Sequence, residues 1–369
     1  MSDSAIIGWD IGGAHLKAVL LSKKGEVLQT SQTTCELWKG LNKLEAAIQT
    51  VLQAFKISPF AAQHAVTMTG ELVDLFTNRH EGVVDIASLA TNLLGERTLF
   101  YAVNTGFVPL QRVSGLWPNI ASANWHASAS ALAMHIQDVL LVDIGSTTTD
   151  IIAIEAGKVI CSGFTDADRM QADSLVYTGV VRTPLMALAQ KLTFANDDGE
   201  VVETNVAAEY FATMADVYRL TGELDANADM ADTADGKGKT QVESARRLAR
   251  MIGHDVDNSL GLGYESISKW IQLAFVCKSL QMQQIKVAML KQLKPNMQII
   301  GAGAGSFLVK AIADDLGRDF MHVYQAVSMR VAEHANIKAQ HDIAVCFPAY
   351  AVAQLLANQL LISQLEVKQ

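Results

Sequence analysis

The chain has 369 residues, of which 50% are hydrophobic and 18% are charged, and its formal net charge is −9. This acidic balance disfavours a general nucleic-acid-binding protein, which needs clustered Lys and Arg side chains. The length predicts two lobes, each with its own core. The four cysteines form no Cys-x-x-Cys pair, so reduced, buried thiols in a cytoplasmic protein are the default expectation.

Neither end of the chain predicts a membrane segment. Asp10 follows the first apolar residues too closely to leave the apolar core of a secretory signal. Residues 343–365 carry no charge and are long enough to span a bilayer, but Pro348 and four amide side chains interrupt them. We therefore expect a packed helix over residues 344–362.

The first half of the chain predicts an open α/β lobe. Apolar runs predict strands over residues 5–10, 15–22 and 26–34. Apolar residues at helical spacing predict a helix over residues 40–56. The remaining expected elements are a strand at 65–68, a helix at 84–94, a strand at 98–103 and an alanine-rich connecting helix at 119–136.

The second half repeats this opening with strands expected at 138–143, 147–154 and 158–164. A mainly helical insertion is expected over residues 185–292, with a loop in its acidic part, residues 225–239. A strand at 297–300 and a helix at 306–315 complete the half. The predicted lobes are residues 1–136 with the C-terminal helix (344–369), and residues 137–343.

One short sequence motif, Asp-Ile-Gly, occurs in both halves. Asp10-Ile11-Gly12-Gly13 and Asp143-Ile144-Gly145-Ser146 each end a buried strand and open a turn to a second strand. Such a turn exposes backbone N–H groups to a phosphate, and its Asp can hold a hydrated divalent cation. We predict that two hairpins clamp one phosphorylated ligand and that Asp10 and Asp143 face Mg²⁺. A strand-end Asp that only caps its turn is the structural alternative.

These hairpins, with the late run Gly301–Gly305, resemble the superfamily of acetate and sugar kinases, heat-shock cognate ATPases and actin. Residues 141–151 look most like its hydantoinase/oxoprolinase branch. More specific similarity, to proteins of tetrahydromethanopterin-linked one-carbon metabolism, lies in residues 7–14, 66–72, 175–184, 234–237 and 246–250. The resemblance implies two ribonuclease-H-like lobes around a central cleft, with the helical insertion in the second lobe.

The archaeal counterpart within this group acts in methanofuran biosynthesis. The resemblance implies its reaction, in which an (aminomethyl)furanylmethyl diphosphate is joined to the phenol of a tyramine or tyrosine derivative and diphosphate is released. It implies Mg²⁺ in the cleft, with either ATP or the diphosphate-bearing substrate. Small-molecule diphosphate and phenolic substrates are the expected partners, without nucleic acid or membrane. The oligomeric state stays open, a homodimer included.

Several residues are candidates for binding phosphate or adenosine. Lys17 could reach a phosphate as a point charge, although a solvated strand lysine fits equally. The glycine run could lie under adenosine, as the resemblance implies, or could only permit tight helix–strand packing. The full set of binding candidates is Gly12, Gly13, Ala14, Lys17, Gly145, Ser146, Thr147, Thr148, Gly301, Gly303 and Gly305.

Four side chains are catalytic candidates. Glu71 follows a strand end, where general bases often lie in α/β folds, or else begins a capped helix. Asp150 is a second acidic cleft residue or a polar residue after a turn. Arg169 and Arg182 suit a diphosphate or carboxylate bidentately, or pair with nearby aspartates at the surface.

Weaker candidates and competing functions complete the predictions. Lys237, Lys239 and Arg246 are further candidate anion ligands, and Arg246, Arg247 and Arg250 are expected on a solvated helix face. A lone histidine such as His15 is expected at the surface. The leading hypothesis is the diphosphate-displacing transferase. The alternatives are an ATP-dependent small-molecule kinase of one-carbon cofactor metabolism and a non-catalytic nucleotide-binding regulator.

Overall fold

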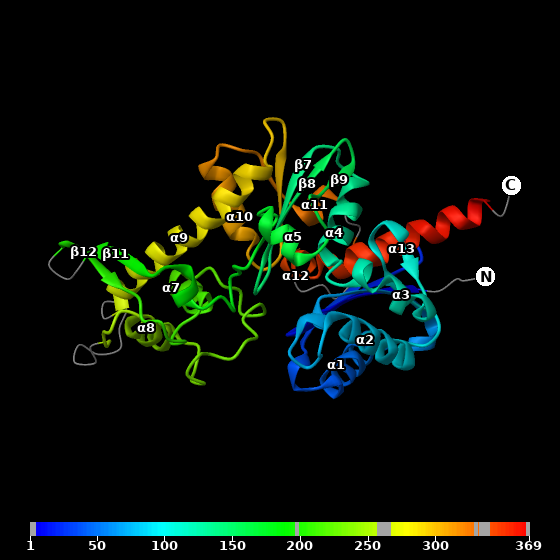
Figure 1. The fold of residues 1–369 in the computed structure, drawn as a ribbon, viewed down its shortest axis with the longest axis horizontal. Coiled ribbons are helices and arrows are strands. Elements are labelled where there is room, and N and C mark those ends of the chain that lie inside the picture. The colour runs from blue at the N-terminus through cyan, green and yellow to red at the C-terminus, as the bar shows by residue number, and fades with distance from the viewer. Residues whose placement is uncertain (1–4, 196–198, 257–266, 328–330, 332–339, 367–369) are drawn as a thin grey trace.

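The computed structural model describes the chain except for residues 1–4, 196–198, 257–266, 328–330, 332–339 and 367–369. Two mixed β-sheets form the centre of the molecule, and the insertion extends to one side of them (Figure 1). The fold class is the one predicted, α/β with two ribonuclease-H-like lobes.

The first sheet has the strand order β3-β2-β1-β4-β5-β6. Its strands are β1 (Ala5–Ile11), β2 (His15–Leu21), β3 (Val27–Thr34), β4 (Ala62–Met68), β5 (Thr98–Tyr101) and β6 (Phe107–Val108). Helices α1 (Leu41–Phe55), α2 (Arg79–Leu94) and α3 (Leu110–Ile120) cover one face of this sheet. Apolar residues at helical spacing bury one side of α1 against it, as the sequence predicts.

The second sheet has the order β10-β8-β7-β13-β14, and β9 pairs with β8. The strands are β7 (Val139–Ile144), β8 (Thr149–Glu155), β9 (Lys158–Ile160), β10 (Leu175–Val176), β13 (Gln298–Ala302) and β14 (Phe320–His322). In both sheets an antiparallel hairpin is followed by a parallel strand on its other side, which is β4 in the first and β13 in the second. The repeated Asp-Ile-Gly motif therefore lies in a repeated structural unit, a hairpin with a parallel strand beside it.

Two helices fill the space between the sheets. They are α4 (Asn124–Ala133) and α13 (Phe347–Glu366), and they share one core cluster with residues of both sheets (Figure 1). A Cβ on Gly8 of β1 would lie 1.9 Å from the Ala349 carbonyl oxygen, so only glycine lets α13 pack this closely. Because both sheets contribute to the core around these helices, the lobe boundaries stay a prediction.

The prediction of one continuous helix over residues 119–136 is wrong, because this stretch contains the end of one helix and a second, separate helix. Helix α3 ends at Ile120 and α4 begins at Asn124, and between them Ser122 has a positive φ of 50°. A non-glycine residue in this left-handed region interrupts a right-handed helix. The C-terminal helix is likewise preceded by a separate helix, α12 (Gln340–Val345). In the described part of the chain, no helix is long and apolar enough to cross a membrane.

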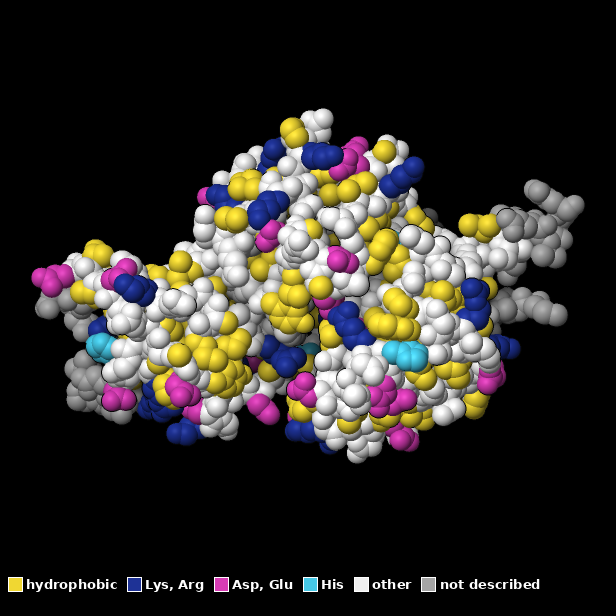
Figure 2. Space-filling view, viewed as in Figure 1, with side chains coloured by type: hydrophobic (Ala, Val, Ile, Leu, Met, Phe, Trp, Pro, Cys, Tyr) yellow, Lys and Arg dark blue, Asp and Glu magenta, His cyan; other side chains and the backbone are white. Residues whose placement is uncertain are grey.

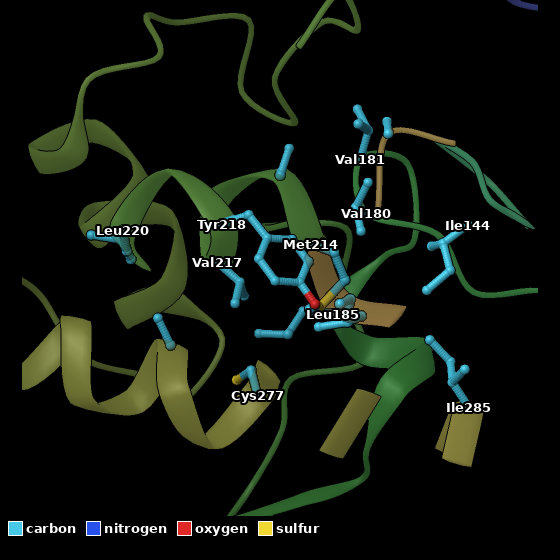
Figure 3. Packing of buried hydrophobic residues seen from close by; sticks show 14 of the residues in the cluster. Ile144, Val180, Val181, Leu185, Met214, Val217, Tyr218, Leu220, Cys277 and Ile285 are labelled. Atoms are coloured by element: carbon cyan, nitrogen blue, oxygen red, sulfur yellow. The ribbon is translucent and has the colours of Figure 1, made fainter. Parts of the chain in front are cut away.

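The insertion contains α6 (Leu185–Leu188), α7 (Met214–Thr221), α8 (Gln241–Arg250) and α9 (Ser268–Gln292). It also contains a two-stranded sheet of β11 (Lys191–Ala195) and β12 (Val201–Asn205), which the helical prediction omitted. The insertion packs on α10 (Ser306–Asp315) and on the end of β7, and the Tyr218 ring lies beside Met214 and Val217 in this core (Figure 3).

The basic residues of α8 do not form the solvated face that the sequence predicts. Arg247 is fully buried, and its Nε donates to Asp216 Oδ1 at 2.9 Å while its Nη1 donates to Asp235 Oδ1 at 2.9 Å. Arg219 adds a bidentate pair to Asp229, with both bonds at 2.6 Å. These pairs hold the acidic loop over residues 225–239 against α7 and α8. Residues 234–237 and 246–250, two of the segments with family-like sequence, therefore take part in the packing of the insertion.

Candidate active site

A cleft of about 410 Å³ lies where the two hairpin turns face each other. Basic and acidic side chains gather around the hollow between the lobes on the face seen in Figure 2. Of the predicted site residues, the cleft wall contains Asp10, Gly12, Gly13, Ala14, Lys17, Asp143, Gly145, Ser146, Thr147, Thr148, Asp150, Arg169 and Arg182. Glu71, Gly301, Gly303 and Gly305 do not line it.

The first hairpin places a carboxylate opposite a lysine. Asp10 is the register partner of Lys17 across β1 and β2, and Lys17 Nζ lies 3.9 Å from Asp10 Oδ2. Asp10 is 5% exposed, and its Oδ1 has no hydrogen-bond partner. Burial raises the pKa of Asp10 above its ordinary value, although the Lys17 charge opposes the shift. An unpaired buried carboxylate oxygen is unfavourable unless a ligand satisfies it.

The second hairpin places two carboxylates opposite each other. Asp143 is the register partner of Asp150 across β7 and β8. Burial raises the pKa of Asp143 to about 7, and the neighbouring charge of Asp150 adds to the shift. Burial also raises the pKa of Asp150, while Arg169 opposes this. Together with Asp10, these groups form an acidic cluster that a divalent cation would stabilise.

The hairpin turns supply backbone donors, although fewer than predicted. The N–H groups of Gly12 and Gly145 donate to His15 and Thr148 carbonyls at 3.0 and 2.9 Å, which closes the turns. Within the described residues, no acceptor takes the following N–H groups, those of Gly13, Ala14, Ser146, Thr147 and Thr148. These donors line the cleft and are available to phosphate oxygens.

The two predicted arginines have different environments. Arg169 is 2% exposed, donates to Asp150 Oδ1 at 2.6 Å and stacks 4.2 Å from the centre of the Trp125 ring. Its guanidinium therefore positions Asp150. Arg182 is exposed, lies 5.6 Å from the Trp38 ring, and has no carboxylate partner in the described chain. Of the two, Arg182 is the better candidate for contact with a diphosphate.

Glu71 lies behind the cleft wall, in the short 3₁₀ helix η3 (Gly70–Leu72). It is 1% exposed, and it accepts a 2.8 Å hydrogen bond from Ser122, which does line the cleft. Burial raises the pKa of Glu71 to about 7, against the opposing effects of the Ser122 hydrogen bond and the Arg79 charge. A carboxyl group with such a pKa can exchange a proton near neutral pH.

The late glycine run packs against β7 and its neighbours. A Cβ on Gly303, which has φ +77°, would lie 2.3 Å from Asp143 Oδ1. A Cβ on Gly305 would lie 2.5 Å from Ile144, and the Gly305 N–H donates to the Ile144 carbonyl at 2.8 Å. Gly301 is similarly crowded by Phe320 and Ser306. These contacts agree with the packing alternative, and adenosine binding at this run stays a prediction.

Sequence reasoning missed several cleft residues. His15 was expected at the surface but is 8% exposed, and burial lowers its pKa to about 4, aided by Lys17 and Arg182. Trp38, Ser122 and Tyr177 also line the cleft. Tyr177 had a usable signal, because it lies in the family-like segment 175–184. Trp38 and Ser122 lie outside the short segments of more specific similarity, which are residues 7–14, 66–72, 175–184, 234–237 and 246–250.

The remainder of segment 175–184 supports the second hairpin. The N–H groups of Val180 and Arg182 donate to the carbonyls of Gly145 and Ser146 at 3.1 and 2.8 Å. Gln281 of α9 in turn donates to Thr178 Oγ1 and the Gly179 carbonyl at 2.7 and 2.9 Å. The insertion thus braces the turn of the second hairpin.

Comparison with known proteins identifies the family. The hydantoinase/oxoprolinase family model matches residues 62–336, which contain the second hairpin and most of the cleft. The chain belongs to the hydantoinase/oxoprolinase family. This confirms the branch that the sequence resembles.

Two relatives of this hydantoinase/oxoprolinase-family chain carry the same name. Both are synthases of a (furan-2-yl)methanamine bearing a phenoxymethyl group with a γ-L-glutamylaminoethyl side chain. The Methanocaldococcus jannaschii protein is 28% identical over 96% of this chain and 98% of its own length. The Methanococcus vannielii protein is 30% identical over 61% of this chain and 93% of its own.

A solved structure shares the fold. The nucleotide-free acetone carboxylase structure matches 96% of this chain and 70% of its own, with a TM-score of 0.57 and 11% sequence identity. At this identity the match bears on the fold alone.

Proposed function

We propose that this chain is a Mg²⁺-dependent transferase of methanofuran-type cofactor biosynthesis. It couples an (aminomethyl)furanylmethyl diphosphate to the phenol of a tyramine or tyrosine derivative and releases diphosphate. The observation that carries this proposal is the cleft in which the two glycine-containing hairpin turns lie beside the carboxylates of Asp10, Asp143 and Asp150. The full-length relationship to synthases whose product contains a phenoxymethyl-furan unit supports it.

The acidic cluster fits a cation that completes its coordination with ligand oxygens. Asp10 Oδ1 is buried and unpaired. Among the described residues, however, no group of three or more His, Cys, Asp or Glu side chains makes a complete metal site. Mg²⁺ commonly uses one or two carboxylates together with substrate phosphates and water. Asp10 and Asp143 would hold it, and when bound it supplies positive charge to the leaving diphosphate.

The chain's own groups act on the same leaving group. The carbon–oxygen bond to diphosphate breaks as the phenol oxygen bonds to the furanylmethyl carbon, so negative charge accumulates on the diphosphate. The free N–H groups of both turns, with Lys17 and Arg182, are placed to stabilise that charge. Trp38 and Tyr177 expose ring surface at the cleft, 40% and 55% respectively, and suit the flat furan and phenol rings.

The phenol needs a proton acceptor because its pKa is about 10 in water. Glu71 is the proposed acceptor, since its pKa of about 7 matches proton transfer near neutral pH. The kinase stays the alternative, and the transferase is preferred because the relative that matches over nearly the full chain is named a synthase.

The experiment is direct. Purified protein with Mg²⁺, the furanylmethyl diphosphate and tyramine should form an aryl ether and diphosphate without ATP, as measured by mass spectrometry. Phosphorylation of the furan alcohol by ATP, with no ether from any phenol, would replace the transferase with the kinase. Diphosphate with Mg²⁺ should also raise the melting temperature, because a ligand at 100 times its Kd stabilises the folded state by about 2.7 kcal/mol.

A further inference from the structure

Ser122 lies between the proposed base and the cleft. Its Oγ donates to Glu71 Oε1 at 2.8 Å, and the second oxygen, Glu71 Oε2, is buried without a hydrogen-bond partner. Ser122 lines the cleft whereas Glu71 does not. A proton that leaves a substrate in the cleft therefore needs an intermediate group to reach Glu71.

The backbone at Ser122 is strained. Its φ of 50° lies in the left-handed region, in the break between α3 and α4. An L-residue with a side chain rarely adopts this conformation, because its Cβ comes too close to the following carbonyl oxygen. The break between the two helices places Ser122 at the cleft wall, where its hydroxyl also reaches Glu71.

A second carboxylate competes for the same role. Asp166 Oδ2 lies 3.5 Å from Ser122 Oγ and also lines the cleft, but Asp166 is ion-paired with Arg79 of α2. The charged groups around Glu71 are Arg79 and Asp166, with the Tyr177 hydroxyl nearby on the second lobe. Asp166 is engaged in its ion pair with Arg79, whereas Glu71 keeps a buried carboxylate oxygen without a hydrogen-bond partner, which makes Glu71 the better proton acceptor.

We propose that Ser122 relays the phenolic proton to Glu71. This inference rests on the proposed transferase function. The phenol O–H bond breaks and its proton passes to Ser122 Oγ, while the proton of Ser122 passes to Glu71 Oε1. The phenol oxygen is left with the electron pair that forms the ether bond. Ser122 emerges unchanged, and Glu71 is neutral at the end of the step.

The test compares Ser122→Ala, which keeps the strain, with Ser122→Gly, which removes it. Both should lower kcat about 100-fold at pH 7 with little change in KM, the lower end for loss of proton transfer. The deficit should shrink towards pH 10, where the phenol ionises without help. A nitro-substituted tyramine, whose phenol ionises near neutral pH, should restore both variants. Ser128→Ala removes a buried hydroxyl of α4 that has no hydrogen-bond partner, and it should leave kcat unchanged.

Each failure has a different signature. If Ser122→Gly has the same kcat as the wild type at pH 7, the relay is wrong. The transferase proposal still stands in that case, provided that the wild-type protein forms the ether. A loss in Asp166→Asn that disappears at high pH, with Ser122→Ala unaffected, would make Asp166 the acceptor. Absence of ether from the wild-type protein with every phenol would overturn the transferase and the relay together.

Discussion

The two hairpins of the cleft have the same backbone but different charge. In each, an aspartate is the last residue but one of the first strand, and the N–H two residues later closes the turn by donating to the carbonyl three residues further on. Lys17 and Asp150 occupy equivalent positions, because each is the register partner of its hairpin's strand-end aspartate. The first hairpin therefore pairs a carboxylate with a lysine, and the second pairs it with another carboxylate.

The fold therefore repeats the hairpin backbone in both halves, while the side chains at positions 17 and 150 give the two hairpins different charges. The second hairpin concentrates negative charge, and the buried Arg169 offsets part of it. The first hairpin brings Lys17 into the cleft at 3.9 Å from Asp10, a separation that leaves the ammonium able to contact another anion. We expect the cation to depend on the aspartates of both hairpins and the diphosphate to depend additionally on Lys17.

The largest expected effect tests whether the hairpins are equivalent at their aspartates. Asp10→Asn and Asp143→Asn should each lower ether formation at least about 100-fold, because each removes a charge facing the cation site. Circular dichroism should show an intact fold, since the volume is unchanged. Asp314→Asn, on an exposed position of α10, is the matched control and should keep full activity. Full activity in either cleft variant would contradict the proposal that both hairpins contribute to one cation site.

The second effect concerns stability and the residues at the equivalent positions. Arg169→Met leaves Asp150 without its ion pair and should lower the free energy of unfolding by about 3–5 kcal/mol, as for other broken buried pairs. Asp150→Asn in the same chain should recover most of this loss. Lys17→Met should cost no more than about 1 kcal/mol because its pair is long and more exposed. Equal losses in Lys17→Met and Arg169→Met, measured by denaturant unfolding, would contradict the difference between the hairpins.

The sequence predicted the repeated hairpins because they are local: strand, aspartate and glycine turn are contiguous. It offered Asp150, Arg169 and Arg182 as cleft candidates beside structural alternatives, and all three line the cleft. It did not predict that Arg169 forms an ion pair with Asp150, since that pair depends on how α5 (Asp166–Gln171) docks on β8. Contacts of this kind are set by tertiary packing, which strand and helix periodicity do not encode.

The misses have the same physical origin. The break at Ser122 lacks Gly or Pro at its centre, so the alanine-rich stretch predicts one helix. The glycine run does not line the cleft because the end of β7 packs against it, and its binding of adenosine stays a prediction. Arg247 looked like part of a charged helix face, and burial became favourable only because Asp216 and Asp235 converge on it.

The third effect uses a difference in the turns after β4 and β13. Glu71 follows β4, whereas the turn after β13 contains glycines and no carboxylate. Because burial raises the pKa of Glu71 from its ordinary value of 4.5 to about 7, the folded state binds the proton more tightly. Its contribution to stability is therefore present below about pH 4.5 and is lost as pH rises to about 7.

Glu71→Gln removes this dependence. Relative to the wild type, the variant should gain about 3 kcal/mol of unfolding free energy between pH 4.5 and pH 8, at about 1.4 kcal/mol for each pKa unit. Ether formation should fall at the same time. The exposed Glu96→Gln is the control and should show no such gain. A difference that stays flat with pH would mean that Glu71 is ionised throughout and has an ordinary pKa.

The smallest effect isolates the one cation of the first hairpin. Lys17→Met should weaken diphosphate binding in the presence of Mg²⁺ about tenfold, the order expected for one charge-assisted contact. Lys17→Arg should keep most of the affinity, because the charge stays at the same strand position. Calorimetric titration measures both, and the loss in Lys17→Met should decrease at high salt because the contact is partly exposed. Equal affinities in all three proteins would mean that Lys17 serves Asp10 alone, and the opposite charges at positions 17 and 150 would then have no role in ligand binding.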